Sequence, residues 1–211
     1  MEIFCRYVLY FILYAFLGWL MEVICKLVEQ KKWINRGFLM GPICPIYGYG
    51  VLGIVFLIGR NKADLLSVFL KSIFVCSFLE YFTSYFMEKL FKARWWDYSQ
   101  RKYNINGRIC LETMLPFGIL GCFVVYILHP LITKLVTMLT PVCQIVLALF
   151  FLFLYLIDNI ISFHVMNKIK GEIKKERTDN TEKVRKKVIK WLTDNSFIYQ
   201  HIKNAYPKFQ V

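Results

Sequence analysis

The stretch MLTPVCQIVLALFFLFLYLIDNIISF, residues 138–163, decides the kind of fold, because it contains a single charged side chain, that of Asp158. An α-helix rises about 1.5 Å per residue, so this stretch is long enough to cross roughly 30 Å of hydrocarbon. Four further stretches are comparably apolar, at residues 3–28, 42–59, 65–90 and 109–133. We therefore expect an all-α fold, a polytopic membrane helix bundle with about five transmembrane helices.

The composition of the 211 residues also indicates an integral membrane protein. Hydrophobic residues make up 57% of the chain, above the roughly 45–50% that is usual for soluble domains. The net charge of +13 comes from basic segments beside the apolar stretches, which fits the positive-inside rule and contact with anionic lipid of the inner leaflet. Nucleic acid is therefore not expected as a partner.

Motifs of common enzymes and metal proteins are absent from the sequence. The seven cysteines include no C-x-x-C pair, which argues against a zinc site and against a disulfide framework. There is no G-x-x-x-x-G-K-[ST], H-E-x-x-H or G-x-S-x-G motif, so the chain does not hydrolyse ATP by itself and has no standard protease or lipase signature. We expect no metal and no cofactor, whereas an uncommon membrane enzyme stays open.

The apolar stretch 42–59 is unusual because it is short and begins with Pro42 and Pro45, followed by several glycines. Part of it is expected to be a bent or re-entrant entry into the membrane. Freed carbonyl groups there could coordinate a cation, and Tyr47 could contact a substrate. The alternative is a simple kink that neighbouring helices satisfy.

Four carboxylates interrupt the apolar stretches: Glu22, Glu80, Glu112 and Asp158. A charge at the centre of a membrane helix costs about 2.5–3.5 kcal/mol, so each needs a partner, a proton or a watery cavity. We expect Glu22, Glu80 and Glu112 to meet around a polar cavity that opens to the cytoplasm. The alternative is that protonated carboxyl groups only form hydrogen bonds between helices.

The loops at the expected cytoplasmic boundary supply further candidate residues. Trp95-Trp96-Asp97-Tyr98-Ser99 could belong to the aromatic belt of the membrane, but a carboxylate among aromatic rings also suits a loop that covers a cavity. The complete set of expected substrate-binding residues is Glu22, Asn35, Arg36, Tyr47, Glu80, Trp96, Asp97, Tyr98, Asn106 and Glu112.

The distribution of lysine and arginine predicts the orientation. Basic residues are concentrated after residue 160, and five spans would place this tail and the basic loops on the same side. By the positive-inside rule that side is the cytoplasm, which makes this a multi-pass protein of the inner or plasma membrane. We divide the chain into a transmembrane domain, 1–163, and a basic cytoplasmic tail, 164–211, with an amphipathic helix at about 182–204.

A weak internal repeat suggests tandem hairpins. Asn35 precedes Pro45 by the same spacing as Asn106 precedes Pro116, and each pair follows a helix with a late glutamate. Two hairpins of equal orientation would form a parallel repeat. The few matched positions leave duplication open.

The chain resembles ABC-transporter permeases of the CmpB type. The matching pieces are Gly18-Trp19-Leu20-Met21-Glu22, Asn35-Arg36-Gly37-Phe38-Leu39, Gly41-Pro42, Pro45-Ile46-Tyr47-Gly48, Glu80-Tyr81, Trp95-Trp96-Asp97-Tyr98-Ser99, and Asn106-Gly107 with Ile109, Leu111 and Glu112. The resemblance covers about residues 10–160 and implies membrane transport with an ATPase partner. It supplies no catalytic residue.

These observations favour a permease-like membrane component that binds a small cationic or polar substrate, or protons, at an acidic site facing the cytoplasm. One alternative is a membrane-embedded enzyme or lipid-handling protein in which the same carboxylates act at the inner leaflet. Another is an accessory protein that does not transport. An ATPase subunit or a second copy of the chain is the expected protein partner.

Overall fold

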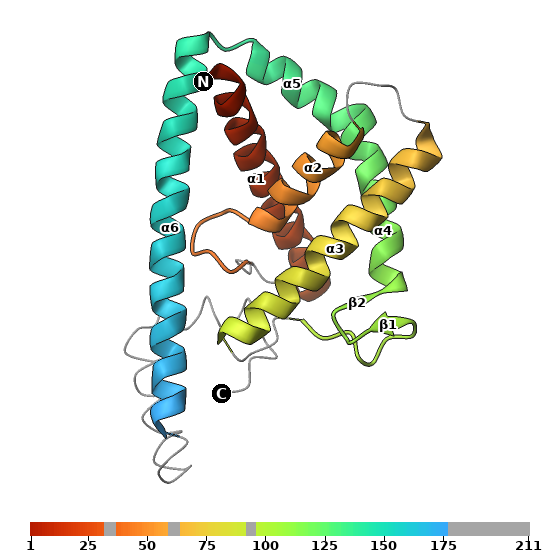
Figure 1. Ribbon diagram of the computed structural model, residues 1–211, viewed down its shortest axis with the longest axis vertical. Helices are drawn as coiled ribbons and strands as arrows, with labels where there is room; N and C mark the ends of the chain where they lie inside the picture. Colours follow the sequence, from red (N-terminus) through yellow and green to blue (C-terminus); the bar gives the residue numbers. More distant parts are fainter. Residues whose placement is uncertain (32–36, 59–63, 92–95, 177–211) are drawn as a thin grey trace.

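The computed structural model describes residues 1–31, 37–58, 64–91 and 96–176 and confirms an all-α helix bundle (Figure 1). The helices are α1 (Glu2–Gln30), α2 (Pro45–Ile58), α3 (Leu65–Phe91), α4 (Leu111–Phe123), α5 (His129–Thr137) and α6 (Pro141–Glu176). Two short antiparallel strands, β1 (Asn104–Ile105) and β2 (Ile109–Cys110), form a hairpin between α3 and α4.

Within the described part of the chain, four helical stretches are long and apolar enough to cross a membrane: Glu2–Val28, Leu65–Phe91, Leu111–Thr137 and Pro141–Val165. The fifth apolar helix, α2, has 14 residues, or about 21 Å, and is too short to span the hydrocarbon alone. The expected bundle of apolar helices is therefore present, with four full-length spans and one short helix.

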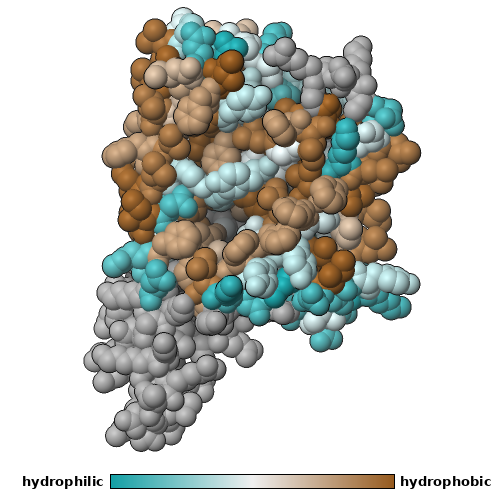
Figure 2. Space-filling model, in the orientation of Figure 1, coloured by the Kyte–Doolittle hydropathy of each residue, from teal (hydrophilic) through white to brown (hydrophobic). Residues whose placement is uncertain are grey.

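The long helices alternate in direction. α1, α3 and α6 run toward the end of the bundle that carries the β1–β2 hairpin, and α4 and α5 run away from it (Figure 1). We call this the hairpin end. Figure 2 shows mostly hydrophobic residues on the face between a hydrophilic lower border, at the hairpin end, and scattered hydrophilic residues at the top. This banding is typical of a protein surrounded by lipid.

The third long span bends because it is not one regular helix. A π-helical turn, Val124–Leu128, separates α4 from α5. Pro130, two residues after this turn, has no N–H to donate, and π turns are a common way to accommodate such an interruption. α5 therefore tilts away from α4 and crosses toward the start of α6 (Figure 1).

Glycines allow the helices to approach closely. A Cβ on Gly18 would lie 2.2 Å from Cγ of Tyr47, and one on Gly121 would lie 2.0 Å from Oγ of Ser72. Such contacts between α1 and α2 and between α4 and α3 are how membrane helices pack when lipid removes the hydrophobic driving force.

The segment 37–44 enters the bundle without regular structure, as a re-entrant segment does. The Cys44 N–H donates to the carbonyl of Ala15, in the middle of α1, at 3.0 Å. The N–H groups of Met40 and Gly41 donate to the carboxylate of Asp158 on α6, at 3.0 Å each. Irregular backbone persists at membrane depth only when protein satisfies it, and these bonds do so.

Three expectations about the chain's organisation stay predictions: the domain division at residue 163, the tail helix and the tandem repeat. α6 continues across the expected domain boundary at residue 163 to Glu176. The amphipathic tail helix at about 182–204 lies outside the described residues. The tandem repeat likewise stays a prediction.

Candidate functional site

The centre of the candidate site is Glu80, on α3. Glu80 is 8% exposed. Its Oε1 accepts a hydrogen bond from the hydroxyl of Tyr98 at 3.1 Å. Its Oε2 is buried and has no partner at hydrogen-bond distance among the described residues, and the Thr113 hydroxyl lies near enough to act on the carboxyl group. A buried carboxylate oxygen without a partner is costly in a protein interior, so it marks a place where a ligand or proton would be stabilised.

A second carboxylate, Glu22 on α1, accepts a hydrogen bond from the hydroxyl of Tyr47 on α2 at 2.6 Å. The Tyr47 ring rests directly on Gly18, one helical turn before Glu22. Any side chain at position 18 would displace this ring. The glycine therefore lets α2 approach α1 closely enough to bring the phenol to the carboxylate.

The two carboxylate–phenol pairs belong to one cluster, because the charge of Glu22 acts on Glu80, Tyr47 and Tyr98. We call these four residues the carboxylate cluster. Its members come from α1, α2, α3 and the loop after α3. Burial and the neighbouring carboxylate of Glu80 raise the pKa of Tyr98, so this hydroxyl stays protonated and available as a donor.

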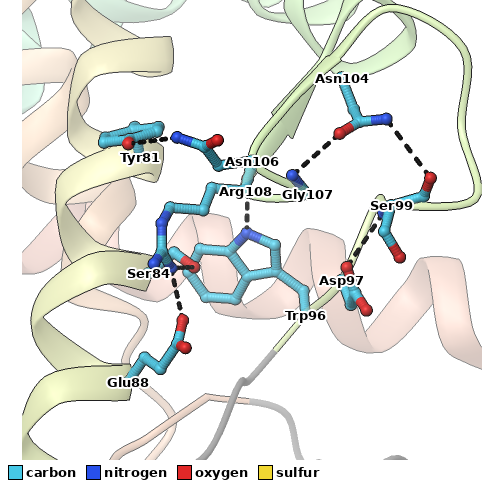
Figure 3. A network of polar contacts seen from close by, with 10 residues as sticks. All are labelled: Tyr81, Ser84, Glu88, Trp96, Asp97, Ser99, Asn104, Asn106, Gly107 and Arg108. Atoms are coloured by element: carbon cyan, nitrogen blue, oxygen red, sulfur yellow. Dashed lines mark hydrogen bonds and ion pairs between the residues drawn. The ribbon is translucent and has the colours of Figure 1, made fainter.

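The β1–β2 hairpin holds Tyr98 in place. Asn106 and Gly107 both have positive φ, 52° and 66°, as the tight turn between the strands requires. The carbonyl of Gly107 accepts from the Tyr98 N–H at 2.8 Å, and the side chain of Asn104 accepts from the Gly107 N–H at 2.9 Å (Figure 3). The turn therefore positions the backbone that carries the Tyr98 phenol.

Arg108 fastens the hairpin to α3 (Figure 3). Its guanidinium donates to Glu88 at 2.6 Å and to Ser84 at 3.5 Å, and it stands over the rings of Tyr81 and Tyr85. The hydrogen bond to Glu88 raises the pKa of Arg108, which therefore remains charged.

Two neighbours complete this attachment. Asn106 donates to the Tyr81 hydroxyl at 2.9 Å. The indole N–H of Trp96 donates to the carbonyl of Arg108 at 2.9 Å (Figure 3). Trp96 and Asn106, both expected to bind substrate, thus hold the hairpin in this structure.

The structure does not bring Glu112 into the carboxylate cluster, which corrects the expectation that three glutamates meet. Glu112 is exposed in the first turn of α4 and forms an ion pair with Arg101 at 2.9 Å. A helix N-terminus and an arginine both stabilise a carboxylate in contact with water. Glu112 therefore has its partner at the surface.

The remaining sequence candidates fall in three groups. Asp97 accepts the Ser99 N–H at 3.0 Å within its own turn. Asp158 supports the re-entrant segment through Met40, Gly41 and Ser162. Asn35 and Arg36 lie outside the described residues.

The sequence reasoning missed Glu88 and Arg108 as the pair that ties the hairpin to α3. A usable signal was the Asn106-Gly107 dipeptide between Ile105 and Ile109, which is typical of a hairpin turn. A hairpin there returns the chain toward α3 and brings Arg108 near its last turns.

Comparison with known proteins identifies the family. The family model described as "Putative ABC-transporter type IV" matches residues 9–163. No curated protein and no solved structure gave a match. The matched region contains the re-entrant segment, the hairpin and all four members of the carboxylate cluster. Because the match extends over more than half of the chain, this protein belongs to the type IV ABC-transporter family of the CmpB type.

Proposed function

We propose that the chain is a membrane component of a transport system in which Glu22 and Glu80 bind a cationic group or a proton. One observation carries the proposal: Oε2 of Glu80 is buried without a partner among the described residues while a second carboxylate acts on it. Family membership and the four apolar spans support a role in membrane transport.

The electrostatics of the carboxylate cluster favour a positive ligand. Two carboxylates in a medium of low dielectric constant repel each other, and each loses the solvation it would have in water. The Tyr98 hydroxyl, which donates to Oε1 of Glu80, brings no positive charge to this carboxylate. A cation or proton would offset the repulsion and give Oε2 of Glu80 a partner.

The route to the site is proposed to start at the hairpin end. Glu80 lies 11 residues before the end of α3 at Phe91, or about 17 Å at 1.5 Å per residue, near the middle of the span. Tyr98 reaches Glu80 from the loop at that end. A ligand that arrives there would meet the Tyr98 hydroxyl first.

The hairpin end is proposed to face the cytoplasm. Basic residues of the described part are concentrated at this end and include Lys26, Lys31, Lys89, Arg101, Lys102 and Arg108. The positive-inside rule then assigns the end of α6 to the cytoplasm. A reporter that is active only in the cytoplasm, fused after Val211, should be active, and activity of a periplasmic reporter there would refute the orientation.

An ATPase partner follows from the family and the absence of a nucleotide-binding motif in the sequence. If the chain acts in ATP-driven transport, a separate subunit must hydrolyse ATP, and the cytoplasmic hairpin end is where it would bind. Affinity purification of the tagged chain from its native membrane should recover such an ATPase. Recovery of the chain without one, at native expression level, would argue against an ATP-driven role.

Glu80→Gln tests the site, with Glu112→Gln as the matched control. Glutamine keeps the size of the side chain but can neither ionise nor shuttle a proton. We would measure uptake of small ammonium and guanidinium ions into vesicles, and thermal stabilisation of the detergent-solubilised protein by the same ions. Both signals should persist in Glu112→Gln and disappear in a folded Glu80→Gln protein.

Persistence of both signals in Glu80→Gln would refute a functional role of this carboxylate. Lipid turnover is measured in the same variants. Turnover that requires Glu80, without ion binding, would favour a membrane enzyme in which Glu80 acts as a general base.

A further inference from the structure

A groove of about 400 Å³ lies between α3, the hairpin and α4, and none of the four residues of the carboxylate cluster lines it. Its lining is mostly apolar and includes Phe74, Phe78 and Phe82 of α3, Ile105 and Ile109 of the hairpin, and Met114 of α4. The volume lies within the range of about 300–1,000 Å³ that is typical of small-molecule sites.

The helix packing explains why the groove exists. Gly121 and Gly118 draw α4 against Ser72 and Phe69 of α3, on the side of the span far from the hairpin. One turn nearer the hairpin, α4 has Met114 where a glycine would allow close contact, and the β1–β2 hairpin lies between α3 and α4 in the chain. The helices therefore diverge toward the membrane boundary.

The rings along the groove face hydrocarbon. Phe74, Phe78 and Phe82 are 66%, 51% and 40% exposed, and they follow one another at intervals of one helical turn. If the groove were empty, the rings that line it would lack dispersion contacts on one side. In a bilayer an acyl chain is the available apolar group of suitable shape.

The charged residues of the hairpin indicate which kind of lipid headgroup would lie beside such an acyl chain. Arg101 pairs with Glu112, and Arg108 pairs with Glu88. Lys102 is exposed and has no ion-pair partner among the described residues. It precedes Ile105 by three positions, at most about 11 Å of chain. A cation at the membrane boundary beside an apolar groove suits an anionic lipid.

We propose that this groove binds one acyl chain of an anionic phospholipid whose headgroup lies against Lys102. The proposal does not depend on Glu80, so it can fail while the proposed function stands.

The test uses native mass spectrometry of the full chain in detergent, with added phosphatidylglycerol or phosphatidylcholine. One phosphatidylglycerol per chain should be retained in preference to phosphatidylcholine. Ile105→Trp, at a position 52% exposed, fills the groove and should remove this binding. Ile160→Trp, on the lipid-facing side of α6 and 70% exposed, is the matched control and should retain it.

A second pair of variants tests the headgroup. Lys102→Ala should weaken phosphatidylglycerol binding about fivefold, the effect of one basic residue near an anionic surface. Lys31→Ala, at the same end of the bundle, should leave it unchanged. Equal retention of the two lipids, or unchanged binding in Ile105→Trp, would overturn the proposal. So would a doubled protein mass that Ile105→Trp abolishes, since a second copy would then occupy the groove.

Discussion

Replacing Asp158 with alanine should release the re-entrant segment at residues 37–44 from α6. The carboxylate accepts the N–H groups of Met40 and Gly41 at 3.0 Å each, and it also accepts the hydroxyl of Ser162 at 3.2 Å. Alanine removes the acceptor of the Gly41 N–H, whereas the Met40 N–H keeps its hydrogen bond to Oγ of Ser162 at 3.2 Å. The variant therefore measures how much these hydrogen bonds to the segment 37–44 contribute to the free energy of unfolding.

The magnitude follows from the number of donors left without an acceptor. A buried donor that loses its partner costs about 1–3 kcal/mol. The Gly41 N–H is the donor that loses its acceptor, since the Met40 N–H also donates to Oγ of Ser162, and with Asp158 only partly buried we expect a loss of about 1–3 kcal/mol. Asp158→Asn keeps one acceptor oxygen and should lose about half as much.

The assay combines thermal unfolding in detergent with amide hydrogen exchange. Asp158→Ala should lower the melting temperature and accelerate exchange at Met40 and Gly41. Asn159→Ala is the control, since the Asn159 amide donates to the carbonyl of Tyr155 in its own helix. Equal stability and unchanged exchange in Asp158→Ala would refute the assigned role of this carboxylate.

Three further variants test the surroundings of the site. Gly18→Ala should destabilise the protein by about 1–3 kcal/mol, because a Cβ would overlap the Tyr47 ring; an unchanged melting temperature would contradict this packing. Wild-type stability should fall as pH rises above about 10, because Tyr98 ionises in the unfolded chain but has a raised pKa when folded. Tyr98→Phe should reduce that slope, and an identical slope would count against a buried phenol. Arg108→Lys loses the planar contact with Glu88 and the neighbouring rings, so it should cost about 1–2 kcal/mol and increase proteolysis of the hairpin; equal protease resistance would rule this out.

The sequence predicted the features that depend on residues close together in the chain. The apolar stretches appear as helices, and the prolines and glycines after residue 41 correctly indicated a segment that is not a simple span. Glu22 and Glu80 were expected to share a site, because a carboxylate within an apolar helix is costly unless it has a partner. The electrostatic effect of Glu22 on Glu80 supports this expectation, which stays a prediction.

The sequence could not predict pairings that depend on the tertiary fold. Glu112 looked embedded because the apolar stretch was expected to begin at residue 109, whereas the hairpin occupies residues up to Cys110 and brings Arg101 to it. Asp158 was recognised as needing a partner, but its partners are backbone N–H groups more than 100 residues earlier. No local pattern identifies such donors.

Labelling with dicyclohexylcarbodiimide tests the central claim most directly. This apolar reagent reacts with protonated carboxyl groups in hydrophobic surroundings, and mass spectrometry locates the modified residue. At mildly acidic pH the account predicts modification of Glu80, slowed by ammonium or guanidinium ions and absent in Glu80→Gln, with Glu112 unmodified because it is exposed and paired with Arg101. Modification of Glu112 in preference to Glu80, or of Glu80 at a rate that none of these cations changes, would contradict a cation-binding carboxylate cluster.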